Sequence, residues 1–94
     1  MVGAETSVGR HAIVSRGALV GHHVEIGDFV TLNPGVNVGG NADVGDRAFV
    51  GMGAVVLNGV AVGADATVAA GAVAIGDVAD GERVQGLPAR PYER

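Results

Sequence analysis

Cysteine is absent from the 94-residue chain, so neither a disulfide nor a thiolate metal site can stabilise it. A chain of this length is close to the lower limit for a hydrophobic core that folds unaided. The missing covalent support therefore favours association of several copies.

Lysine and long apolar runs are absent too. All six basic residues are arginine, and the formal net charge is −4. Because nucleic-acid-binding domains usually carry a basic face, we expect no nucleic-acid partner. No apolar run approaches the ~20 residues of a membrane span, and no signal-peptide pattern opens the chain. The expectation is a cytoplasmic protein without a membrane partner.

What the sequence does contain is a period of six residues. A branched aliphatic residue recurs at every sixth position, the next position is usually glycine, and a small or β-branched residue stands two positions before. The aliphatic positions are Val2, Val8, Val14, Val20, Ile26, Leu32, Val38, Val44, Val50, Val56, Val62 and Val68. Chance does not sustain this register.

Six residues make one short β-strand and one tight corner, since β-branched residues favour strands and glycine tolerates unusual corner dihedrals. A helix is disfavoured because a six-residue period does not stay on one helical face, and because the chain holds 17 glycines. Three such units close a triangular coil. The sequence therefore predicts an all-β fold: a left-handed parallel β-helix of about four coils, an exception to the usual right-handed crossover.

The expected organisation is a β-helix over residues 1–76 and a C-terminal cap or tail over residues 77–94. Pro88 and Pro91 should stop strand pairing in that tail. Residues three hexads apart should stack directly, one strand spacing apart. His22 then shares a corner column with Ala4 and Gly40, and position alone favours a solvated corner residue.

Three segments carry a resemblance to a known family: VGHHVEIGDFVTLNPGVNVGGNADVG (20–45), VGMGAVVLNGVAVG (50–63) and AGAVAIGDVADGERVQGLPAR (70–90). With them the chain resembles the hexapeptide-repeat acyltransferases, and among these the sugar acetyltransferases of NeuD or PglD type. The G-x-P-A-R ending and the histidine-bearing corner narrow the branch. The resemblance covers only the C-terminal β-helix portion of such enzymes, so their N-terminal α/β substrate domain is not expected within these residues.

The resemblance implies acetyl transfer from acetyl-CoA to an amine or hydroxyl of a sugar nucleotide or related small molecule. It assigns His22 as general base and the Gly40 N–H as oxyanion donor. Imidazole titrates near neutrality and can take the acceptor's proton. A bare glycine backbone lets the thioester approach the N–H that stabilises its tetrahedral oxyanion.

The residue after the base departs from the family pattern. Relatives usually have Asp or Glu there, whereas this chain has His23. Glu5 lies three hexads earlier and should stack against His23, so a relay of Glu5, His23 and His22 is one hypothesis. The alternative is a solvated His23 and a weaker site. Relatives also carry His at Thr31 and Asn at Ser15, and these changes concern the acceptor more than the acetyl donor.

For coenzyme A, the resemblance points to the corner column that contains Met52 and Ala70, with Thr31 and Gly40 near the acetyl group. Met52 offers adaptable apolar contact, or alternatively packs against a neighbouring subunit. Arg90, held behind Pro88, is the candidate for the nucleotide's phosphates. Arg83 and Arg94 are equally explained as a solubilising tail.

The family implies a homotrimer, in which the histidine of one subunit approaches its neighbour's groove. The C-terminal segment is interpreted as a cap or as an arm that reaches a neighbour, with Tyr92 as its anchor. No metal is expected, because His11, His22 and His23 do not fit the three-histidine spacing of the carbonic anhydrases of this fold. Two alternatives remain open: a trimeric β-helix scaffold without acceptor specificity, and acetylation of a small non-sugar acceptor such as an amino acid.

Overall fold

The computed structural model describes residues 2–91, so the expectations for Tyr92 and Arg94 lie outside the described residues. Within this range the regular elements are short β-strands, and no residue is helical. The strands are β1 (Ser7–Val8), β2 (Ile13–Val14), β3 (Leu19–Val20), β4 (Glu25–Ile26), β5 (Thr31–Leu32), β6 (Asn37–Val38), β7 (Asp43–Val44), β8 (Phe49–Val50), β9 (Val55–Val56), β10 (Ala61–Val62), β11 (Thr67–Val68), β12 (Val73–Ala74), β13 (Arg83–Gln85) and β14 (Arg90–Pro91).

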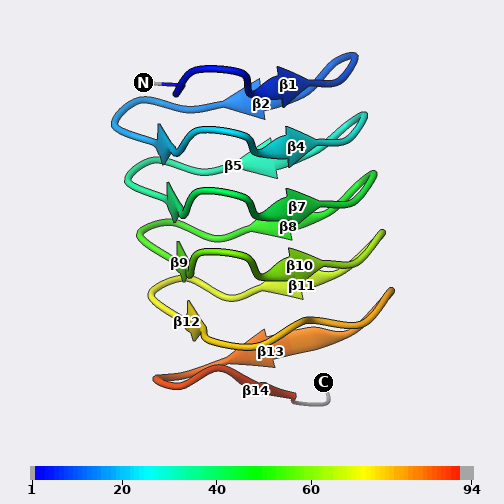
Figure 1. Cartoon of the computed structure of the whole chain (residues 1–94). Coiled ribbons are helices and arrows are strands. Elements are labelled where there is room, and N and C mark those ends of the chain that lie inside the picture. The colour runs from blue at the N-terminus through cyan, green and yellow to red at the C-terminus, as the bar shows by residue number, and fades with distance from the viewer. Residues whose placement is uncertain (1, 92–94) are drawn as a thin grey trace.

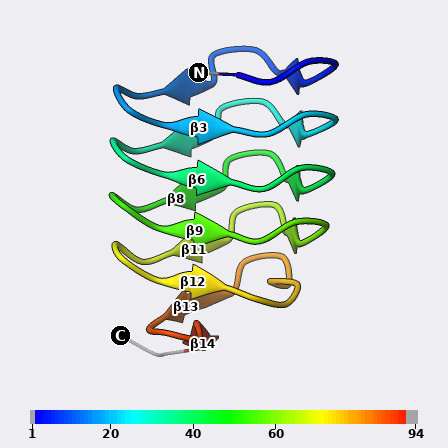
Figure 2. The ribbon, with the colours of Figure 1, turned by 60° about the vertical axis from the view of Figure 1, so that its left-hand side comes forward.

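Every third strand pairs in parallel with the next, so the chain winds as a stack of coils with three faces (Figure 1). The first face holds β1, β4, β7 and β10; the second holds β2, β5, β8, β11, β13 and β14; the third holds β3, β6, β9 and β12. Partners are three hexads apart, as in Leu32↔Val50 and Val38↔Val56. Figure 2 shows the same regular stacking from another side. The predicted all-β fold is confirmed, with the architecture expected of a left-handed parallel β-helix.

The core is a set of stacked aliphatic side chains. In most strands the second residue points inward and is buried, while the first faces outward. Leu32 is the largest side chain that is fully buried, and none of the buried residues in the described range is polar or charged. Valine and leucine therefore supply the hydrophobic stabilisation, and backbone hydrogen bonds join one coil to the next.

Corner geometry superposes side chains from successive coils. Non-glycine residues at the same corner position adopt a left-handed backbone conformation: Glu5, His11, His23, Phe29, Asn41, Arg47 and Asp65. Bulky side chains such as Phe29 rarely adopt positive φ. Because the conformation repeats from coil to coil, the side chains at any one corner project in the same direction and form a column.

The last coil, at the C-terminal end, contains fewer residues than the others. β13 pairs with β11 in the register Val68↔Val84, and β14 turns back antiparallel along β13. The prediction that strand pairing stops in the tail is therefore wrong for Pro91, which pairs with Val84 in an edge strand, where proline is tolerated. The Ala89 N–H donates to the Val73 carbonyl at 2.8 Å, which holds the Gly86–Ala89 loop over the end of β12. None of the described residues forms a helix able to span a bilayer.

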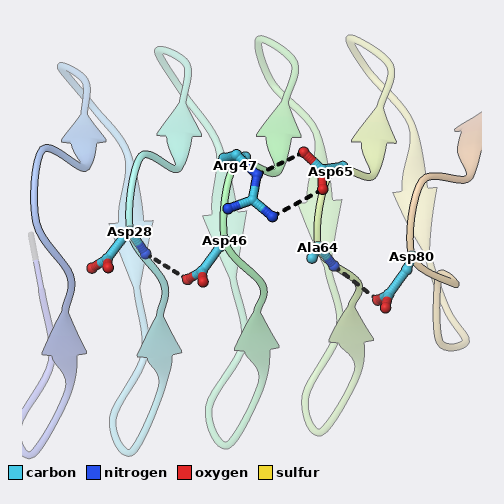
Figure 3. Close-up of polar contacts among 6 residues, drawn as sticks. All are labelled: Asp28, Asp46, Arg47, Ala64, Asp65 and Asp80. Carbon is cyan, nitrogen blue, oxygen red and sulfur yellow. Dashed lines mark hydrogen bonds and ion pairs between the residues drawn. The ribbon is translucent and has the colours of Figure 1, made fainter.

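A ladder of aspartates follows the corner between the first and second faces (Figure 3). Asp46 Oδ1 accepts the Asp28 N–H at 2.8 Å, and Asp80 Oδ1 accepts the Ala64 N–H at 2.9 Å. Ala64 offers no such oxygen, so one rung between these two is missing. In the neighbouring column Arg47 donates twice to Asp65, at 2.9 and 3.0 Å. That pair is exposed and contributes little to stability.

The ladder predicts how stability responds to acid. The backbone N–H of Arg10 donates to Asp28 and holds the pKa of that carboxyl below its ordinary value. A pKa lowered by folding adds stability above the ordinary pKa, and that stability is lost as the pH falls through the folded pKa. We therefore expect Asp28→Asn, which keeps an acceptor oxygen but no charge, to lose less Tm than the wild type below about pH 4.

Thermal unfolding from pH 7 to pH 3 checks this expectation. Asp43→Asn is the matched control, because the Asp43 side chain lies outward on β7 and its carboxylate accepts no hydrogen bond within residues 2–91. The control should follow the wild-type curve. If the Tm of Asp28→Asn and the Tm of the wild type fall equally with pH, the hydrogen bond to Asp28 contributes nothing to the acid response.

Candidate active site

His22 lies at the corner between β3 and β4, and its ring reaches toward the next coil. A Cβ built on Gly40 would lie 3.3 Å from both Cε1 and Nε2 of His22. The His22 carbonyl accepts the Asn41 N–H at 3.0 Å, which fixes the two coils in register at this corner. The Nε2 edge of the imidazole therefore faces Gly40 at a distance where an added side chain would crowd the ring.

Gly40 offers an unused donor beside this imidazole. Its carbonyl accepts the Gly59 N–H at 3.0 Å, but its own N–H makes no hydrogen bond within residues 2–91. Gly40 is half-buried and does not adopt positive φ. The neighbouring Gly39 is also needed, because a Cβ there would collide with Asn58 Oδ1. The two glycines leave a backbone donor open next to a potential base.

A chain of contacts leads from the imidazole of His22 to a carboxylate. The Nδ1 atoms of His22 and His23 are 3.0 Å apart, with the two rings at 89°. His23 Nε2 lies 2.8 Å from Glu5 Oε1. All three side chains are exposed, with Glu5 at 74% and His23 at 55%. The structure thus brings together Glu5, His23, His22 and Gly40, the four residues predicted for catalysis.

A shallow groove of about 380 Å³ runs along the third face beside this corner. Its floor and walls come from β3, β6 and β9, and it reaches the corner at Gly21, Gly39 and Asn58. Leu19, Val55 and Leu57 make its lining largely apolar. Volumes of this size suit small ligands.

The residues predicted to bind coenzyme A lie elsewhere on the chain. Met52 and Ala70 occupy the corner between the second and third faces, at the other edge of the groove-bearing face, and Met52 is 61% exposed. Thr31 points outward from β5 on the second face and is half-buried. Arg90 begins β14, at the C-terminal end of that face, and is exposed. A single copy does not bring these residues into contact with His22.

The structure adds features that were not expected from the sequence. The His11 ring stacks on Phe29 at the corner between the first and second faces, with centroids 5.2 Å apart. The same three-hexad spacing that pairs Glu5 with His23 could have revealed this stack. A second groove, of about 430 Å³ on the first face, is lined by Glu25, Asp43 and Asp80 and is acidic. Within the described residues, no three histidine or carboxylate side chains gather as metal ligands.

No family model and no curated protein sequence matches the chain. Solved structures do match. A histidine-to-alanine mutant of GDP-perosamine N-acetyltransferase from Caulobacter crescentus, in complex with CoA and GDP-perosamine, has a TM-score of 0.97 and 36% identity, covering 99% of this chain and 44% of that one. The acetyltransferase domain of PglB from Neisseria gonorrhoeae, in complex with acetyl coenzyme A, has a TM-score of 0.95 and 35% identity, covering 97% and 44%.

A serine acetyltransferase in complex with CoA is also similar, with a TM-score of 0.88 and 28% identity, covering 93% of this chain and 39% of that one. The chain therefore spans less than half the length of each of these three proteins.

Proposed function

Because the chain matches the β-helical part of the hexapeptide-repeat acyltransferases, in their sugar acetyltransferase branch, we propose that it transfers the acetyl group of acetyl-CoA to an amine or hydroxyl of a small molecule. A sugar nucleotide is the first candidate acceptor. The two most similar structures described above hold CoA or acetyl-CoA, and one also holds GDP-perosamine.

The observation that carries the proposal is the Nε2 edge of His22 facing Gly40, whose N–H is unused within residues 2–91. His22 Nε2 takes a proton from the acceptor as it attacks the thioester carbon. The carbonyl oxygen becomes an oxyanion and accepts the Gly40 N–H. The intermediate then collapses, the C–S bond breaks, and the CoA sulfur leaves as a thiolate that takes up a proton.

The donor's binding site extends beyond one chain. We place the pantetheine arm along the corner of Met52 and Ala70, the acetyl group near Thr31 and Gly40, and the nucleotide phosphates at Arg90. Since Thr31 and His22 lie on different parts of one coil, a neighbouring copy in a homotrimer supplies one side of this cleft. Arg90 makes no ion pair within the described residues, which leaves its guanidinium available for phosphate.

Two chemical classes are candidates for the acceptor. An amino sugar nucleotide fits the resemblance to the GDP-perosamine enzyme, and the likeness to serine acetyltransferase keeps an amino acid as the alternative. The acidic groove on the first face repels phosphates, so a nucleotide-bearing acceptor approaches from the third face instead.

Calorimetry with acetyl-CoA, followed by thiol release with a panel of amino sugar nucleotides and serine, tests the proposal. The chain contains no cysteine, so every thiol detected comes from CoA. We expect binding, and thiol release that depends on one acceptor class. A stable trimer that binds no acetyl-CoA would identify a scaffold instead.

Gly40→Ala tests the cleft between the imidazole and the amide. The backbone at Gly40 tolerates alanine, but the added Cβ would lie 3.3 Å from His22 Nε2 and fill the space that the thioester needs. Alanine keeps the backbone N–H, but its methyl group holds the thioester oxygen away from that donor. We expect the fold to persist and kcat for thiol release to fall by about 10²–10³, an effect comparable with the loss of an oxyanion donor.

Gly76→Ala is the matched control, because a Cβ there would meet nothing within 4 Å and its backbone is equally permissive. That variant should keep wild-type kcat. Equal activity in both variants would remove Gly40 from the mechanism.

A further inference from the structure

Glu5 and His23 have no place in the chemistry described so far, although His23 contacts the proposed base and Glu5 contacts His23. We infer that they are positioning residues that hold His22 in one tautomer and carry its proton away through a two-imidazole relay. This inference rests on the proposed acetyl transfer at His22. It begins with the contacts Glu5 Oε1–His23 Nε2 at 2.8 Å and His23 Nδ1–His22 Nδ1 at 3.0 Å.

The carboxylate decides which nitrogen carries each proton. An ionised Glu5 can only accept, so His23 Nε2 must be the donor in their contact. Neutral His23 then has a lone pair on Nδ1, and it accepts a hydrogen bond from His22 Nδ1–H. His22 is left with its own lone pair on Nε2, the edge that faces Gly40. One carboxylate thus fixes two tautomers and points the basic nitrogen at the acceptor.

The same contacts provide a path for the proton. When His22 Nε2 takes the acceptor's proton, its Nδ1 proton can pass to His23 Nδ1. His23 is then an imidazolium, its Nε2–H still bonded to Glu5, and His22 is neutral with the proton on Nε2. His23 and Glu5 are both exposed, so the excess proton leaves to water on the side away from the thioester. An ammonium acceptor needs this exit, because amide formation from RNH₃⁺ and a thioester releases one proton besides the thiol.

The backbone explains how a residue of the preceding coil reaches His23. Glu5 and His23 both have φ of 57°, the left-handed conformation that repeats at this corner. The His23 N–H donates to the Ala4 carbonyl at 3.0 Å, which locks the two corners in register.

Other charged groups near this corner do not compete for the imidazoles. The coil above presents Gly40 and Asn41, which do not titrate. On the flanking strands, Glu25 of β4 and Asp43 of β7 point outward from the first face and make no ion pair with either histidine. Because the pair of Glu5 and His23 is exposed, its electrostatic energy is screened. The pair of Glu5 and His23 therefore acts by orienting the histidine rings and by fixing their tautomers.

Imidazole ¹⁵N NMR tests the relay without substrate. The chain holds only three histidines, and His11 serves as an internal reference. We expect wild-type His22 to carry its proton on Nδ1, whereas the isolated side chain carries it mainly on Nε2. His23→Ala and Glu5→Ala should return His22 to the Nε2–H form, and Glu25→Gln should not. Nε2–H on His22 in the wild type, or no change in either alanine variant, would overturn the relay.

The kinetic arm separates charge from hydrogen bonding. Glu5→Gln keeps an acceptor oxygen but removes the negative charge. Because the amide can also present its N–H₂ to His23, the tautomer is no longer enforced, and kcat should fall about 10- to 100-fold with KM for acetyl-CoA unchanged. This loss is smaller than the ~10⁴ caused by a buried tautomer-setting aspartate in the serine protease triad.

Glu5→Asp should recover part of the lost rate. Wild-type kcat in Glu5→Gln would refute the proton path. A wild type that shows the Nδ1–H tautomer but no acetyl transfer would overturn the proposed function and leave the tautomer assignment standing.

Discussion

Replacing His22 with alanine is expected to lower kcat for thiol release from acetyl-CoA by about 10²–10⁴, the usual contribution of a positioned general base. The Nε2 edge of this imidazole faces Gly40, and the three atoms nearest to a Cβ built there all belong to His22. We expect no substitution by His23, because its Nε2 lies against Glu5 of the preceding coil. Affinity for acetyl-CoA, measured by calorimetry, should be unchanged, because the imidazole acts on the acceptor's proton.

His11→Ala is the control for this experiment. His11 is the same residue type at another corner, where its ring stacks on Phe29. That variant should retain wild-type kcat. Full turnover in His22→Ala would remove the base from the mechanism, and with it the function proposed for this corner.

Leu32→Ala is expected to have the largest effect on stability, about 2–5 kcal/mol from the urea-unfolding free energy. Leu32 is fully buried, and it lies opposite Val14 of the preceding coil and Val50 of the following coil. Removing its side chain leaves a cavity that the rigid coil cannot close, since hydrogen bonds on both sides fix the spacing between coils. For a domain of this size the loss is a large share of the total stability.

Leu87→Ala provides the comparison, because Leu87 is 79% exposed in the loop that precedes β14. The expected change there is within about 0.5 kcal/mol. A Leu32→Ala variant with wild-type stability would mean that the inward column does not form the core, contrary to the burial pattern.

Much of the fold follows from the six-residue period. A strict period makes each coil repeat the same turns, so the register between strands and the inward aliphatic column can be predicted by counting. The contacts of Glu5 with His23 and of His11 with Phe29 obey the same spacing. The cap could not be predicted in this way, because the period ends there and β13 pairs with β11 at a shorter spacing.

The sequence alone determined the coil, its faces and the residues that share each corner, because backbone periodicity and hydrophobic burial are both encoded locally and repeat along the chain. Only the tertiary structure decided what those residues do to one another. The orientation of the His22 ring, the unused N–H of Gly40 and the contact between two Nδ1 atoms depend on side-chain rotamers packed between successive coils. Side-chain rotamers depend on packing against neighbours that are distant in sequence, so they cannot be predicted by counting along the chain.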